Sequence, residues 1–165
     1  MFMSEKDFQN LIERHPHLVK SQIELPPKQN KYRNIKLYEY SDGYVSENKK
    51  LTCHGNVIHV FDSTKEYNRW MELKLLERAG EISNLERQKS LIIQDAFTYQ
   101  SLQGKHKISP ITYKADFCYF YKNKLFVEDV KPFDDDTGKY HLTKDFSLKW
   151  KLLMFKYPDY EFVIF

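Results

Sequence analysis

Residues 111–131 contain two runs of β-branched and aromatic side chains, at 111–121 and 125–131, joined by the short polar segment Lys122-Asn123-Lys124. Such runs favour strands, and a link this short favours an antiparallel hairpin. Apolar residues recur at helical spacing on either side of the hairpin, at 63–79 and 143–156, and a last strand is predicted at 160–165. This order predicts an α/β chain with a central mixed β-sheet flanked by helices.

The strongest helix signal is at residues 63–79. Ser63 and Glu66 have the spacing of a capping box, and Gly80 stands where a glycine often ends a helix. The apolar stripe of this helix consists of Trp70, Leu73, Leu76 and Ala79. Weaker patterns predict a helix at 4–14, a hairpin of strands at 34–40 and 56–61, a strand at 85–94 and a polar loop at 134–138.

Composition excludes several classes of protein. Of the 165 residues, 41% are hydrophobic and 30% are charged, which excludes a disordered tail and a membrane protein. The N-terminus has no signal-peptide pattern, and two cysteines fit a reducing compartment, so we expect a cytoplasmic protein that does not enter a membrane. We expect residues 1–27 to form an N-terminal helix and linker, and residues 28–165 to form one domain.

Charge is unevenly distributed although the net charge is only +3. Cations gather at 28–36, 105–124 and 139–156, whereas 128–136 is an acidic block. This pattern suits a polyanion held near a metal ion, but from charge alone three solvated lysine-rich faces and an acidic turn are the favoured explanation.

The candidate for chemistry lies on the 111–131 hairpin. Asp129 and Lys131 fall on one face of a strand because side chains alternate, and Asp116 on the partner strand can approach Asp129. Two close carboxylates need a neutralising cation, and a hard divalent ion fits this role. Carboxylates that fix a metal, with a lysine beside the nucleophile, are what phosphodiester cleavage requires. The structural alternatives are a hydrogen-bonded Asp116 and an exposed Asp129–Lys131 ion pair.

Glu66 is the third candidate carboxylate. It lies in the first turn of its helix, in line with Trp70 and Leu73, so it can point toward a sheet. A glutamate at this position of a capping box also caps its own helix, and the spacing does not separate the two roles. A zinc site is disfavoured, because Cys53, His54 and His59 lack a second ligand pair at zinc spacing and His15 and His17 stand alone.

These residues together resemble the PD-(D/E)XK nuclease superfamily. The resemblance is carried by Glu66 on a helix, by Asp116, and by Asp129-Val130-Lys131, with twelve residues between Asp116 and Asp129. Over residues 28–165 the chain resembles a phage-borne family of small nucleases, related to Holliday-junction resolvases and to the endonuclease subunit of Tn7-type transposases. The further segments that carry this likeness are 31–34, 61–66, 73–82, 85–88 and 113–117. Pro132 departs from the glycine usual in close phage relatives.

The resemblance implies the superfamily's core and its metal site. Mg²⁺ or Mn²⁺ would be held by Glu66, Asp116, Asp129 and the Val130 carbonyl, Lys131 would be the catalytic lysine, and Gln88 would lie beside the site. For Gln88, a polar residue on an exposed strand face is an equally good reading. With such a site nearby, DNA phosphates would be bound by Lys31, Arg33, Lys139, Lys144, Lys149 and Lys151.

The expected function is therefore a metal-dependent DNA endonuclease. A homodimer acting on branched DNA in phage recombination or replication, in the host cytoplasm, is the leading expectation, because two symmetric nicks in a junction need two active sites. One alternative is a transposase-type endonuclease subunit that cuts DNA ends with a partner. The other is a nucleic-acid-binding protein with an inactive nuclease fold.

Overall fold

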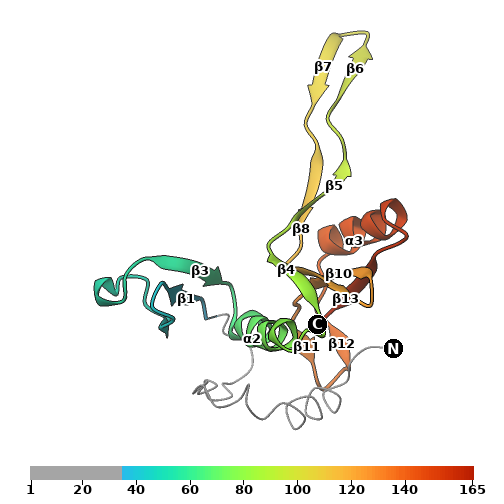
Figure 1. Ribbon diagram of the computed structural model, residues 1–165. Coiled ribbons are helices and arrows are strands. Elements are labelled where there is room, and N and C mark those ends of the chain that lie inside the picture. The colour runs from blue at the N-terminus through green and yellow to red at the C-terminus, as the bar shows by residue number, and fades with distance from the viewer. Residues whose placement is uncertain (1–34) are drawn as a thin grey trace. The chain divides into compact units, whose positions relative to one another are not determined.

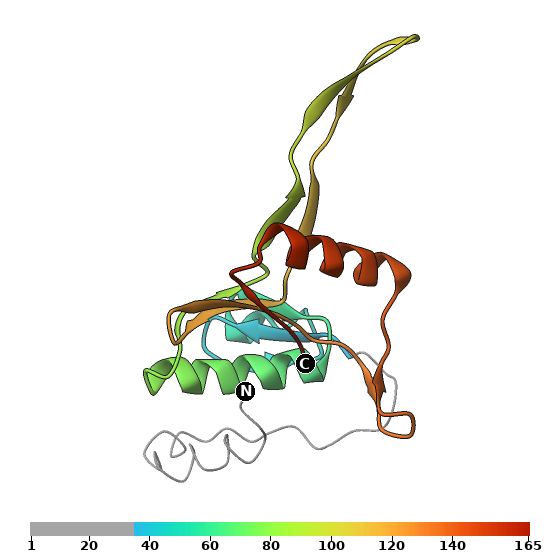
Figure 2. The same ribbon diagram turned by 90° about the vertical axis from the view of Figure 1, so that its right-hand side faces the viewer.

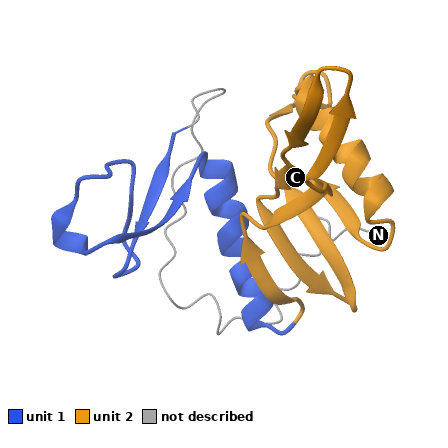
Figure 3. Ribbon diagram, turned by 90° about the horizontal axis from the view of Figure 1, so that it is seen from above, with its two compact units in different colours: residues 1–80 blue, residues 81–165 orange. Residues whose placement is uncertain are grey.

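The computed structural model describes residues 35–165, which form a mixed α/β arrangement made mostly of strands (Figure 1). The predicted helix at 4–14 and the boundary at residue 27 lie outside the described residues. The chain divides into two compact units, residues 1–80 and 81–165 (Figure 3). No helix among the described residues is long and apolar enough to cross a membrane.

The first unit contains a three-stranded antiparallel sheet in the order β2-β1-β3, followed by a helix. The predicted pairing of 34–40 with 56–61 is confirmed, since Leu37 lies opposite Phe61. The long polar connection between them contains one more short strand and a 3₁₀ turn. The elements are β1 (Leu37–Tyr40), β2 (Val45–Ser46), η2 (Thr52–His54), β3 (Val57–Phe61) and α2 (Thr64–Arg78).

Helix α2 begins and ends as the sequence predicts. The Ser63 hydroxyl accepts a hydrogen bond from the Glu66 N–H at 3.1 Å, and Gly80 follows the helix with a positive φ of 75°. Trp70, Leu73 and Leu76 are buried, which confirms the apolar stripe. Helix α2 contacts β3 through two edge-on ring pairs, Phe61 with Tyr67 and His59 with Trp70.

The second unit is built on a four-stranded sheet in the order β13-β10-β9-β4. Strands β10 and β13 are parallel and the other neighbours are antiparallel, so this sheet is mixed, as predicted. Two positive-φ residues, Lys122 and Asn123, form the tight turn between β9 and β10. The sheet strands are β4 (Ser83–Arg87), β9 (Phe117–Tyr121), β10 (Lys124–Asp129) and β13 (Glu161–Ile164).

Helix α3 (Lys144–Lys156) connects the hairpin of β11 (Phe133–Asp134) and β12 (Lys139–Tyr140) to β13. Its Thr143 cap and its end before Pro158 agree with the predicted helix at 143–156. The helix buries its apolar side in the core of this unit, where it packs in the same cluster as Val127 of β10. The buried cluster consists of Leu91, Ala115, Cys118, Leu125, Val127, Phe146, Trp150 and Leu153.

Two predicted strands are interrupted in the structure. The strand predicted at 85–94 breaks at Gln88, whose φ of 51° is left-handed and ends regular pairing. The strand predicted at 111–121 breaks at Ala115 and Asp116, where the chain leaves one partner strand and joins another. The additional strands are β5 (Ser90–Gln94), β6 (Phe97–Ser101), β7 (Gly104–Ile108) and β8 (Ile111–Lys114). Strands β6 and β7 were not predicted.

Candidate active site

Asp116 and Asp129 lie at the same end of the β9–β10 hairpin. Phe117 is paired with Glu128, so the next position along the same register places Asp116 opposite Asp129. The Asp116 Oδ2 accepts a hydrogen bond from the Val130 N–H at 2.8 Å, and the Asp116 carbonyl accepts one from the Gln88 N–H at 2.9 Å. Antiparallel pairing therefore brings the two predicted carboxylates to adjacent positions on neighbouring strands.

Asp129 is a buried carboxylate with only 2% of its surface exposed. The Tyr113 hydroxyl donates a hydrogen bond to its Oδ1, and the Lys131 ammonium forms an ion pair with its Oδ2. Lys131 Nζ also lies 4.4 Å from the centre of the Phe146 ring, which adds a cation–π contact. A buried carboxylate is tolerated only with such partners, and Tyr113 and Lys131 supply one for each oxygen of Asp129.

Tyr113 belongs to segment 113–117, which carries part of the resemblance, but no role in the site was predicted for it from the sequence. Burial, and next the negative charges of Asp116 and Asp145, raise the pKa of the Tyr113 hydroxyl, so it stays protonated and remains a donor. Its ring packs against Phe146 and Trp150 of α3, which fixes its direction. Its position three residues before Asp116 was a signal in the sequence. The Tyr113 hydroxyl could not be matched to the Asp129 carboxylate, however, before the break between β8 and β9 was known.

The acidic block predicted at 128–136 is divided by the alternation of β10. Glu128 points to the opposite face from Asp129, is fully buried, and accepts a hydrogen bond from the Tyr119 hydroxyl at 2.9 Å. Asp134 instead lies in the β11–β12 hairpin, where backbone N–H groups of its turn lower its pKa. The acidic block is therefore not a single cluster.

Glu66 caps its own helix in the first unit. Its Oε2 accepts a hydrogen bond from the Asp62 N–H at 2.8 Å, one residue earlier than in the standard capping box, and the side chain is 4% exposed. The capping role is thus observed, and the metal-binding role stays a prediction. Gln88, which the resemblance places beside the site, lies at the break between β4 and β5 and is exposed. Its backbone N–H donates a hydrogen bond to the Asp116 carbonyl.

The predicted DNA-binding residues fall in different settings. Lys31 and Arg33 lie outside the described residues. Lys139, Lys144 and Lys151 are exposed, whereas Lys149 is half-buried and pairs with Asp145 at 3.1 Å. Lys144 and Lys151 therefore remain the better phosphate-binding candidates on α3.

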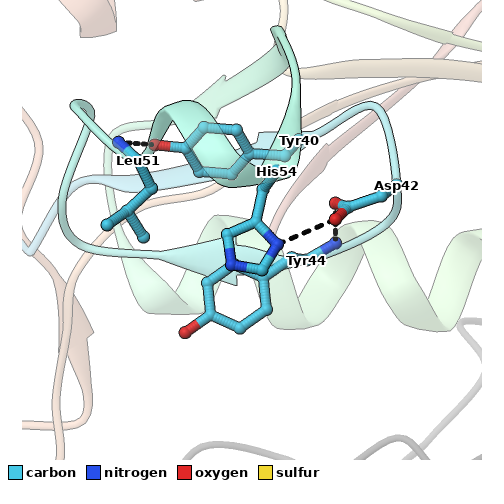
Figure 4. Close-up of polar contacts among 5 residues, drawn as sticks. All are labelled: Tyr40, Asp42, Tyr44, Leu51 and His54. Carbon is cyan, nitrogen blue, oxygen red and sulfur yellow. Dashed lines mark hydrogen bonds and ion pairs between the residues drawn. The ribbon is translucent and has the colours of Figure 1, made fainter.

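A second polar cluster lies in the first unit, in the connection between β1 and β3 (Figure 4). The His54 Nδ1 lies 2.8 Å from the Asp42 carboxylate, and the His54 ring stacks on Tyr44 with centroids 3.9 Å apart. The Tyr44 N–H and next the His54 ring lower the pKa of Asp42, so this carboxylate stays ionised and its bonds are lost only in acid. The Tyr40 hydroxyl accepts from the Leu51 N–H at 3.3 Å. The cluster braces the loop.

Within residues 35–165, no group of three or more His, Cys, Asp or Glu side chains is placed to hold a metal ion. The donor chemistry nevertheless suits a hard cation in the second unit, because the Asp116 and Asp129 carboxylates and the Val130 carbonyl are oxygen ligands. Lys131 now supplies the positive charge beside Asp129. Carboxylate and carbonyl oxygens are hard ligands, so these residues fit Mg²⁺ or Mn²⁺ better than they fit a softer metal.

The chain matches the protein family described as "Protein of unknown function (DUF1064)" over residues 43–164. Because this match covers more than half of the 165 residues, the chain belongs to that family. The matched region includes Glu66, Asp116, Asp129 and Lys131. No curated protein sequence matches the chain.

Replacing Glu66 with glutamine separates its cap from its predicted metal role. The side-chain carbonyl of the new glutamine can still accept the Asp62 N–H, so we expect the melting temperature to change by no more than about 2 °C. An amide brings no negative charge to a cation, so we expect DNA cleavage to be lost. Glu66→Ala is the control that removes the cap as well and should lower the melting temperature. Wild-type cleavage by Glu66→Gln would remove Glu66 from the proposed ligands.

Proposed function

We propose that this chain is a metal-dependent DNA endonuclease of the PD-(D/E)XK superfamily. The observation that carries the proposal is that Asp116, which accepts a hydrogen bond from the Val130 N–H, lies at the same end of the β9–β10 hairpin as Asp129, with Lys131 in contact with Asp129. Two carboxylates that could hold a metal ion, with a lysine beside them, suit metal-assisted hydrolysis of a phosphodiester.

The fold of the second unit supports this assignment. Its mixed sheet contains an antiparallel hairpin, β9–β10, and then a parallel strand, β13, that is reached through helix α3. The resemblance implies a central mixed sheet that carries Asp116 and Asp129 and a helix that flanks it, and this likeness in topology supports the proposal. Because one fold serves many functions, the side chains at the hairpin end carry more weight than the topology.

Each residue of the proposed site has a defined task. Within the second unit, Asp116, Asp129 and the Val130 carbonyl would hold Mg²⁺ or Mn²⁺, which when bound supplies charge neutralisation and an activated water; Glu66 stays a ligand predicted from the sequence. Tyr113 holds the Asp129 carboxylate in place through its hydroxyl. The Val130 N–H holds Asp116 in the same way. Lys131 would place its ammonium beside the scissile phosphate or the attacking water, where positive charge stabilises the transition state.

The proposed substrate is branched DNA, cut by a homodimer in the cytoplasm of a host cell during phage recombination or replication. Two-fold related cuts in a four-way junction require two copies of the site. The exposed Lys139, Lys144 and Lys151 are available for phosphate contacts in the second unit.

The experiment that tests this function is incubation of the purified full chain with a supercoiled plasmid, a labelled linear duplex and a labelled four-way junction. Each is tested with Mg²⁺, with Mn²⁺ and with EDTA. We expect cleavage of the junction with either metal, slower nicking of the plasmid, and no cleavage in EDTA. An unchanged junction at saturating protein with both metals would contradict the proposal, as would cleavage that persists in EDTA.

A further inference from the structure

Within the second unit, β5 pairs with β8, and β6 pairs with β7 farther along the same ribbon. The β6–β7 pair is called the arm. Figures 1 and 2 show the arm extending beyond helix α3. The register continues without a shift from the Gln94–Ile111 pair to the Ser101–Gly104 pair at the tip. Residues 95–96 and 109–110 are not in strands, so β6 and β7 form a separate two-stranded sheet in the same register, with Leu102 and Gln103 forming its turn.

The two faces of the arm differ in chemistry. Phe97 and Ile108 are paired, as are Tyr99 and His106, so these four side chains share one face. Phe97 is 48% exposed and Tyr99 is 57% exposed. The other face carries Thr98 opposite Lys107 and Gln100 opposite Lys105. Aromatic rings kept together on an exposed ribbon indicate an interaction surface, because folding gains little from them there.

The charge of the ribbon limits the kind of partner. Between Asp95 and Asp116 the chain has no acidic residue, whereas it has Lys105, Lys107 and Lys114. A partner with negative charge and flat apolar groups complements both faces, and a nucleic-acid strand has both in each nucleotide. Phe97 and Tyr99 are about 6.8 Å apart along the strand, so each ring can stack with a separate base. In a duplex the bases are already stacked on each other, so unpaired nucleotides fit these rings better.

We propose that the arm binds single-stranded DNA, with bases stacked on Phe97 and Tyr99 and phosphates bound by Lys105 and Lys107. The two lysines lie on the opposite face of β7. Because β6 and β7 form a sheet of two strands, β7 has an unpaired edge, and the long lysine side chains can extend around it toward phosphates of a strand bound on the aromatic face. The choice of DNA rests on the proposed nuclease function. The arm would then give the enzyme its preference for DNA with unpaired segments, by binding beside the site of cleavage rather than at it.

The test is the affinity of the full chain for a fluorescein-labelled oligothymidine, measured by anisotropy in EDTA, with a duplex of equal length for comparison. We expect tighter binding to the single strand. Phe97→Ala and Tyr99→Ala should each weaken this binding about fivefold or more and leave duplex binding unchanged. Tyr99→Phe should bind as the wild type does, because the stacking ring is kept.

Changing Lys105 and Lys107 together to Ala should lower the salt slope of single-strand binding by about 1.4. Matched controls are Phe155→Ala, whose side chain is 87% exposed on α3, and the double change of the exposed Lys49 and Lys50 to Ala. The proposal is overturned if the aromatic variants bind the single strand normally, or if the wild type binds the duplex equally well. Because EDTA prevents metal-dependent cleavage, a chain without nuclease activity still gives a positive or a negative result.

Discussion

Asp116→Asn and Asp129→Asn are each expected to reduce the single-turnover rate of DNA cleavage by about a thousandfold or more. Loss of one carboxylate ligand removes both charge neutralisation and activation of the attacking water, which amounts to several kcal/mol of barrier. The measurement is cleavage of a labelled junction at saturating protein and saturating Mg²⁺. Binding in EDTA should change little, because the phosphate contacts come mainly from lysines.

The two variants should differ in stability. In Asp116→Asn the remaining side-chain carbonyl can still accept the Val130 N–H, so the melting temperature should stay near that of the wild type. In Asp129→Asn the buried ion pair with Lys131 is lost, and we expect a fall of several degrees. Asp159→Asn, at an exposed position of the same unit, is the matched control. Near-normal cleavage by a folded Asp116→Asn variant would refute the site assignment.

The sequence predicts the fold best where the signal is local. The caps at Ser63 and Thr143 and the tight turn at Lys122-Asn123 place two helices and one hairpin correctly. The hairpin then determines that Asp116 faces Asp129, because antiparallel register follows from the turn. The mixed α/β arrangement follows from the order of these elements.

Non-local features were not predictable in the same way. The break at Gln88 depends on a left-handed residue that is not glycine, and the hydrogen bond from Tyr113 to Asp129 crosses the other break, at Ala115 and Asp116. Strands β6 and β7 were missed because most of their side chains are exposed, so no hydrophobic pattern pointed toward a core. Lys131 was placed correctly on the face of Asp129, but its contact with the Phe146 ring needs the packing of α3.

Lys131→Met should abolish cleavage, whereas Lys144→Ala combined with Lys151→Ala should weaken DNA binding and leave the saturated rate near normal. Methionine keeps an apolar side chain of similar length over Phe146 but removes the ammonium beside Asp129. A charge at this position acts on the transition state more than on bound DNA, so the loss should appear in the single-turnover rate. Lys144 and Lys151 are exposed on α3, where we expect them to contact backbone phosphates.

The salt dependence of junction binding separates these two classes of lysine. Two lost phosphate contacts should reduce the slope of log affinity against log salt by about 1.8 for the double variant. Lys131→Met also removes the cation that is paired with the buried Asp129, so its melting temperature should fall in EDTA, and Mg²⁺ should restore part of the loss by binding the folded chain. Normal cleavage by Lys131→Met would contradict a catalytic role for Lys131. An unchanged slope for the double variant would contradict phosphate binding by Lys144 and Lys151. A melting temperature that does not respond to Mg²⁺ in either wild type or Lys131→Met would show that the two carboxylates do not bind the cation.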